Sequence, residues 1–121
     1  PCRFGATPGY HAAATLCRME DRPTALFCAN DDIACGAIEA VRAHSLECPR
    51  DISLIGFDNF SVSHHTLPPL TSIEQPVADM VRVAIEHLVR MVKDSSSPVR
   101  MLLPVRLVER QSVTSPELQK A

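Results

Sequence analysis

The stretch PTALFCANDDIACGAIEAVRAHSL, residues 23–46, joins an apolar run, a polar corner and an amphipathic segment. The run Ala25–Ala29 shows no polar alternation, which is typical of a strand covered on both faces of a parallel sheet. Asn30, Asp31 and Asp32 are candidate N-caps, because their side-chain oxygens can accept from the free amides of a helix's first turn. Apolar residues then recur at helical spacing, at Ala34, Ala37, Ile38 and Val41. The stretch predicts a strand, a turn and a helix in succession.

The same pattern begins again at Ser53–Phe57, an apolar segment followed by Asp58 and Asn59. A strand, a helix and a second strand within about 30 residues make a βαβ unit. Ligands of open parallel sheets bind beyond the carboxyl ends of the strands, and neighbouring strands lie about 4.8 Å apart. Asn30 and Asp58 would then share one edge, where an amide and a carboxylate suit a polyhydroxylated ligand. From spacing alone, the alternative that both residues are only caps stays open.

Composition narrows the function classes. The chain has 121 residues and a formal net charge of −2, without a basic block, so it is a poor candidate for binding nucleic acid by itself. No apolar run approaches membrane-spanning length. The chain starts at Pro1 without a methionine or a secretory signal, and we expect it to be a piece of a longer protein.

Signatures of catalysis, metal binding and cofactor binding are missing from the sequence. It contains no G-x-S-x-G, P-loop or H-E-x-x-H pattern, so we predict that it is not an enzyme. Five cysteines without a CxxC pair favour reduced thiols in a cytoplasmic protein over a metal site. Asp31 and Asp32 at a helix start favour capping over magnesium binding. No metal or cofactor is predicted.

The flanking segments predict further elements. Thr7 as cap and Pro8 at the first helical position predict a helix that ends near residues 21–23. Three more elements follow the βαβ unit: a short strand at Thr71–Ile73, a long helix from Val77 to about Lys93, and a last strand from Met101 to Val108 in which Pro104 favours an edge or irregular position. The long helix is apolar on more than one face, so we expect the isolated chain to self-associate through it.

Three ordered segments carry a resemblance to a known family. Residues 23–59, then PPLTSIEQP at 68–76 and LLPVRLVERQS at 102–112, closely resemble the effector-binding domain of the lactose/galactose repressor (LacI/GalR) family. The resemblance implies an α/β, parallel-sheet, periplasmic-binding-protein-like (type I) fold. It also implies two subdomains with a sugar or nucleoside-like effector in the cleft between them. This chain would be the C-terminal portion, with the DNA-binding domain upstream.

The resemblance also assigns site residues. Asn30 matches the asparagine of the family's AND motif and Asp58 the acid of its GFDD-like motif, and both would hydrogen-bond the effector. Asn59 stands where the motif has a second acid, which leaves its role open. Phe4 matches an aromatic that lies against the ligand's apolar face; the alternative is a core aromatic.

The implied organisation has four parts. Residues 1–70 would form the C-terminal effector-binding subdomain, and 71–94 a strand and helix crossing to the N-terminal subdomain. Residues 95–114 would return to the C-terminal subdomain, and 115–121 would form a tail.

The resemblance implies the effector-sensing and dimerisation portion of a cytoplasmic transcriptional repressor. Its partners would be a small-molecule effector, a second copy in a homodimer, and operator DNA only through the domain outside this chain, with no membrane. The alternative is a solute-binding protein of a sugar ABC transporter, which shares the fold. An odd set of cysteines argues against the periplasm.

Overall fold

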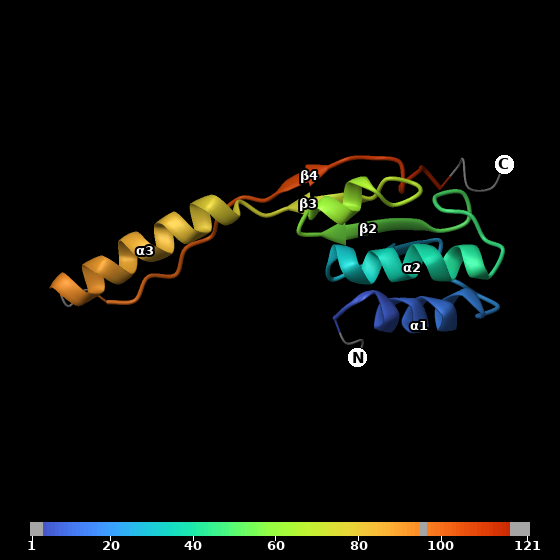
Figure 1. The fold of residues 1–121 in the computed structure, drawn as a ribbon, viewed down its shortest axis with the longest axis horizontal. Helices are drawn as coiled ribbons and strands as arrows, with labels where there is room; N and C mark the ends of the chain where they lie inside the picture. Colours follow the sequence, from blue (N-terminus) through green and yellow to red (C-terminus); the bar gives the residue numbers. More distant parts are fainter. Residues whose placement is uncertain (1–3, 95–96, 117–121) are drawn as a thin grey trace. The chain divides into compact units, whose positions relative to one another are not determined.

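A computed structural model describes residues 4–94 and 97–116 of the chain (Figure 1). The order of elements is α1 (Ala6–Cys17), β1 (Ala25–Phe27), α2 (Asp31–Ala43), β2 (Ser53–Phe57), the 3-10 helix η1 (Ser61–His64), β3 (Thr71–Glu74), α3 (Val77–Asp94) and β4 (Arg106–Val108). The described chain divides into two compact units, residues 4–74 with 107–116, and residues 75–106.

The sheet has the strand order β1-β2-β3-β4. β1 pairs with β2 in parallel, with Phe27 opposite Ile55, and β2 pairs with β3 in parallel, with Ile55 opposite Thr71. The predicted βαβ unit is confirmed, because the helix between the parallel strands β1 and β2 is α2. The predicted strand Ser53–Phe57 has the observed bounds of β2.

The core of the first unit lies between the sheet and its two helices. In Figure 1, α2 runs between the sheet and α1. The stripe predicted for this helix is buried, because Ala34, Ala37, Ile38 and Val41 are all at most 4% exposed. Ile52, Leu54 and Leu70 from the sheet side are fully buried in the same cluster. Helical periodicity in the sequence therefore identified the buried face of α2.

Two glycines allow α1 and α2 to approach closely. A Cβ added at Gly36 of α2 would overlap the carbonyl oxygen of Ala6, and one added at Gly9 of α1 would overlap the carbonyl oxygen of Ile33. These neighbours are backbone atoms, which cannot rotate away as a side chain can. The two helix backbones therefore pack without a side chain between them at these positions.

The substitution Gly36→Ala should destabilise the protein by about 1–3 kcal/mol, because overpacking outweighs the gain of about 1 kcal/mol in helix propensity. Glu39→Ala, at an exposed position of the same helix, is the control and should be nearly neutral. Urea unfolding of the two variants measures the difference. An unchanged or higher midpoint for Gly36→Ala would show that the helices separate without cost.

Four predictions about these elements need correction. α1 begins at Ala6, after Gly5 with φ 119°, and has no side-chain cap, so the predicted start, with Thr7 as cap and Pro8 as first helical residue, is wrong. α1 also ends at Cys17, before the predicted residues 21–23. β1 was expected to be covered on both faces, yet only the face of Leu26 packs against the core, and Phe27 on the other face is 64% exposed. The last strand is only Arg106–Val108, since Pro104 cannot donate to a ladder.

The second unit consists of α3 and the segment that follows it. The predicted helix from Val77 to about Lys93 is confirmed as α3. Residues 99–105 return beside it (Figure 1), and an apolar groove lies between them, lined by side chains such as Met80, Ala84 and Leu103. Large apolar side chains of α3 remain exposed, among them Val81, Ile85, Leu88 and Val92. Across the described residues, no helix combines the length and the apolar character that crossing a membrane requires.

Candidate functional site

Asn30 and Asp58 lie at the same edge of the sheet, as predicted. Asn30 follows β1 and Asp58 follows β2, and the parallel pairing of these strands places both at their carboxyl ends. The Oδ1 atom of Asn30 accepts a hydrogen bond from the backbone N–H of Ile33 at 2.9 Å, which confirms that Asn30 caps α2. The groups of Asn30 that remain for a ligand are its amide nitrogen, which donates, and the second lone pair of its Oδ1.

The chain turns sharply at Asp58. Residues 58–60, which we name the rim turn, contain two non-glycine residues with positive φ, 104° at Asp58 and 53° at Asn59. Such backbone angles are uncommon for residues with a Cβ and cost about 1–3 kcal/mol each. Strain of this kind persists only where surrounding contacts fix it, and it is concentrated at binding sites. The rim turn therefore combines a predicted ligand residue with a strained backbone.

Asp31 has a role that the sequence did not predict. Asp31 and Asp32 were candidate caps of α2 beside Asn30, but Asn30 is the cap and Asp31 is the first helical residue. Its side chain is 0% exposed. Its Oδ1 accepts from the Ser72 hydroxyl at 2.6 Å, and its Oδ2 accepts from the Phe60 backbone N–H at 2.7 Å. Asp31 thus connects α2, β3 and the rim turn.

The electrostatics of Asp31 follow from this burial. Removal from water raises the pKa of the Asp31 carboxyl above its ordinary value, and the hydrogen bonds from Ser72 and Phe60 only partly oppose the rise. The negative charge of Asp58 raises the Asp31 pKa further, and the positive charge of Arg110 lowers it. In the described part of the chain, no group of three or more His, Cys, Asp or Glu side chains could hold a metal ion.

Asn59, whose role the sequence left open, has a defined set of partners. Its Nδ2 donates to Glu74 Oε1 at 3.0 Å, and its Oδ1 accepts from Arg110 Nη2 at 2.6 Å. Arg110 also donates through Nη1 to the carbonyl oxygen of Leu70 at 2.6 Å and lies 2.9 Å from His64 Nε2. Asn59 therefore ties the rim turn to β3 and to the segment after β4. Glu74 and Arg110 lie far from Asn59 in the sequence, so no local sequence pattern predicts these contacts.

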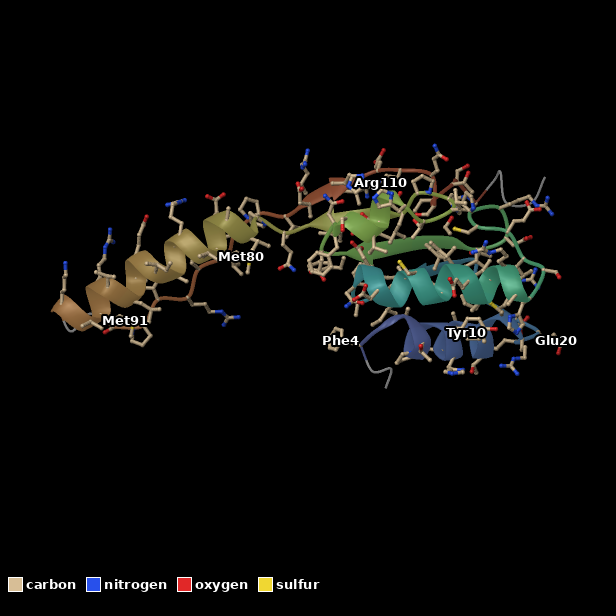
Figure 2. All side chains as sticks on the ribbon, in the orientation of Figure 1. Phe4, Tyr10, Glu20, Met80, Met91 and Arg110 are labelled. Carbon is tan, nitrogen blue, oxygen red and sulfur yellow. The ribbon has the colours of Figure 1, made fainter. Side chains whose placement is uncertain are left out.

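Phe4 is not a core aromatic, since it is 77% exposed. Figure 2 shows its ring at the N-terminal end of α1, directed away from the helices. It borders an apolar groove of about 320 Å³ that Leu16, Phe27 and Ile33 also line. Asn30 and Asp58 do not line this groove. The structure therefore brings Asn30 and Asp58 to one edge and places Phe4 at a neighbouring apolar surface.

Two half-buried thiols of the first unit have raised pKa values. Burial, with the negative charges of Asp32, Asp31 and Glu39, raises the pKa of Cys35 to about 11. Burial also raises the pKa of Cys48 to about 12. Both stay protonated at neutral pH, and a protonated thiol is neither a nucleophile nor a metal ligand.

Comparison with known proteins decides the family. Residues 3–113 match the family described as the periplasmic binding protein-like domain. The chain belongs to this family. The domain is 41% identical over 111 residues to the HTH-type transcriptional repressor PurR of Aliivibrio salmonicida, a match that covers 91% of this chain and 33% of that protein. It is 36% identical over 113 residues to the ribose operon repressor of Haemophilus influenzae, covering 93% of this chain and 34% of that protein.

Solved structures agree with the sequence relatives. The lac repressor dimer bound to operator and the anti-inducer ONPF matches with a TM-score of 0.87 at 29% identity, over 94% of this chain and 40% of that one. A LacI family transcriptional regulator from Lactobacillus casei with bound sucrose matches with a TM-score of 0.76 at 28% identity, over 91% of this chain and 41% of that one. The predicted fold class and the resemblance to the repressor family are confirmed. The domain spans about a third of the length of the curated relatives it matches.

Proposed function

We propose that the domain is the effector-sensing and dimerisation part of a bacterial transcriptional repressor. The observation that carries the proposal is the pairing of Asn30 and Asp58 at one sheet edge, in a chain whose relatives are named as repressors. The effector would be a sugar or nucleoside-like molecule. Asp58 would accept hydrogen bonds from its hydroxyl or amine groups, Asn30 would donate to it, and Phe4 would cover its apolar face.

The proposed mechanism is a population shift. The effector would favour one closure of two subdomains over another and so change the spacing of DNA-binding heads in a homodimer. Residues 4–74 and 107–116 would belong to the C-terminal subdomain, and residues 75–106 would contain the crossing to the N-terminal one. Operator contact would come from the remaining two thirds of the protein. The proposed compartment is the cytoplasm, and no catalytic step is proposed.

A solute-binding protein of a sugar transporter is the second candidate, favoured by the family description alone. It would carry a signal peptide upstream, whereas a repressor would carry a helix-turn-helix. Several buried or half-buried thiols suit a reducing compartment and so favour the repressor.

A thermal-shift screen of sugars and nucleosides on the longer protein tests the proposal. A ligand that binds only the native state at a hundred times its Kd stabilises it by about 2.7 kcal/mol. We expect one class of compound to raise the melting temperature and to change operator affinity in a gel-shift assay. A stabilising compound that leaves operator affinity unchanged would contradict the repressor mechanism.

A further inference from the structure

All three backbone N–H groups of the rim turn have acceptors. Asp58 N–H donates to the Ile73 carbonyl oxygen at 2.8 Å. Asn59 N–H donates to Ser72 Oγ at 3.1 Å, and Phe60 N–H donates to Asp31 Oδ2 at 2.7 Å. The second acceptor also depends on Asp31, because the Ser72 hydroxyl donates its proton to Asp31 Oδ1 and thereby turns a lone pair toward Asn59. Two of the three bonds therefore lead to one buried carboxylate.

We propose that Asp31 is a positioning residue that fixes the left-handed backbone of the rim turn and so directs Asp58 toward the effector. The part of this statement that concerns the effector rests on the proposed function. Asp31 itself is fully buried and would not touch the ligand. Its two oxygens instead hold the backbone of the turn. Oδ2 accepts directly from the Phe60 N–H, and Oδ1 accepts from the Ser72 hydroxyl, which in turn accepts from the Asn59 N–H.

The surrounding fold makes room for this carboxylate. Gly56 stands beside it in β2, and a Cβ at that position would overlap Asp31 Oδ1 and press on a Leu70 methyl group. The strand that precedes the rim turn therefore has no side chain at the position next to the carboxylate. An asparagine would fit the same space, but only one of its two terminal atoms accepts, and Phe60 and Ser72 both donate.

Burial works against the ionised form of this carboxylate. Because folding raises the pKa of Asp31, the ionised form is less favourable in the fold than in the unfolded chain. The contribution of Asp31 to stability is fully present below its unfolded pKa and is lost as the pH rises through the folded pKa. Burial of the ionised carboxylate therefore opposes folding, and the two hydrogen bonds that hold the rim turn only partly oppose this effect. Asp58 and Arg110 are the charged groups that act on it from the rim turn and from the segment after β4, and neither removes the cost.

NMR of the isotopically labelled chain at pH 7 tests the proposal with Asp31→Asn and a matched control, Asp32→Asn. Asp32 lies next to Asp31 in the first turn of α2, is exposed, and loses the same charge on substitution. In Asp31→Asn we expect the HN–Hα coupling constant and the ¹³C chemical shifts of Asp58 to change, so that they no longer indicate a positive φ. The Phe60 amide should exchange about tenfold faster or more, because a hydrogen bond to a charged acceptor is lost.

The control should keep both signals, and the Leu54 amide should stay protected in both variants, which separates positioning from a general loss of structure. Wild-type signals for Asp58 and Phe60 in a folded Asp31→Asn variant would overturn the proposal. If that variant does not fold, a pH titration of the wild type decides. The Phe60 amide shift should then titrate with a midpoint above the ordinary aspartate value, and a shift that stays flat through the acid range would overturn it.

These readouts contain no ligand. An effector site that excludes Asp58 would therefore leave the positioning of the turn intact, and an unaltered turn would leave effector binding by Asp58 intact. The two failures are distinguishable.

Discussion

Asp58→Ala is expected to weaken effector binding by about ten- to a hundredfold and to leave the fold intact. A hydrogen bond that involves a charged partner contributes roughly 1.5–3 kcal/mol, and about 1.4 kcal/mol corresponds to a factor of ten in affinity. The side chain is not part of the hydrophobic core, which lies between the sheet and the helices α1 and α2. Isothermal calorimetry, with the compound that the thermal-shift screen selects, measures the change in affinity.

A second substitution, Asp58→Gly, separates the effect of the carboxylate from the effect of backbone strain. At φ 104° a glycine removes the carboxylate and relieves the strain together, whereas alanine removes the carboxylate and keeps the strain. Asp58→Gly should therefore lose as much affinity as Asp58→Ala and be more stable by roughly 1 kcal/mol. Unchanged affinity in both variants would remove Asp58 from the site. Equal stability of the two would show that the turn is not strained.

The sequence predicted those parts of the fold whose determinants are local. β2 and the buried stripe of α2 follow from apolar spacing within a few residues. The sequence offered Asn30, Asp31 and Asp32 as caps of α2, and Asn30 is the cap. The parallel pairing of the strands follows from the helix between them. The edge position of β1 could not be predicted, because an apolar run does not reveal how many strands lie beside it.

In the candidate site, too, the residues with local determinants were predicted and those with long-range partners were not. Asn30 and Asp58 were found because each directly follows an apolar run of the sequence. In the structure Asp58 directly follows β2, whereas β1 ends at Phe27 and two residues separate it from Asn30. The buried role of Asp31 was missed, because its partner Ser72 lies 41 residues away and an acid at a helix start looks like a cap. The contact between Asn59 and Arg110 spans 51 residues and was missed for the same reason. Long-range polar contacts follow from the folded backbone, and a single sequence contains no period that reveals them.

The isolated 121-residue chain should self-associate through α3 at micromolar concentration. Leu88 is 60% exposed and Val92 is 85% exposed, and Val81 and Ile85 are also exposed on this helix. The segment that returns beside α3 adds Leu102, which is 89% exposed. Contiguous apolar surface of this kind is rare on monomers, and fully burying one such side chain contributes roughly 1.5–3 kcal/mol. We expect a second copy of the chain to provide the cover in this form of the protein.

Sedimentation velocity of the wild type and of an Ile85→Glu/Leu88→Glu double variant tests this expectation. The double variant should be monomeric, because burying two carboxylates without partners costs more free energy than the apolar contact contributes. Arg90→Glu changes the charge at an exposed polar position of the same helix and should still associate. A monomeric wild type whose α3 amides resist hydrogen exchange would contradict the prediction, since the helix would then be stable without cover. A double variant that still associates would place the contact on another surface, and the edge strand β1, where Phe27 is exposed, would be the next to substitute.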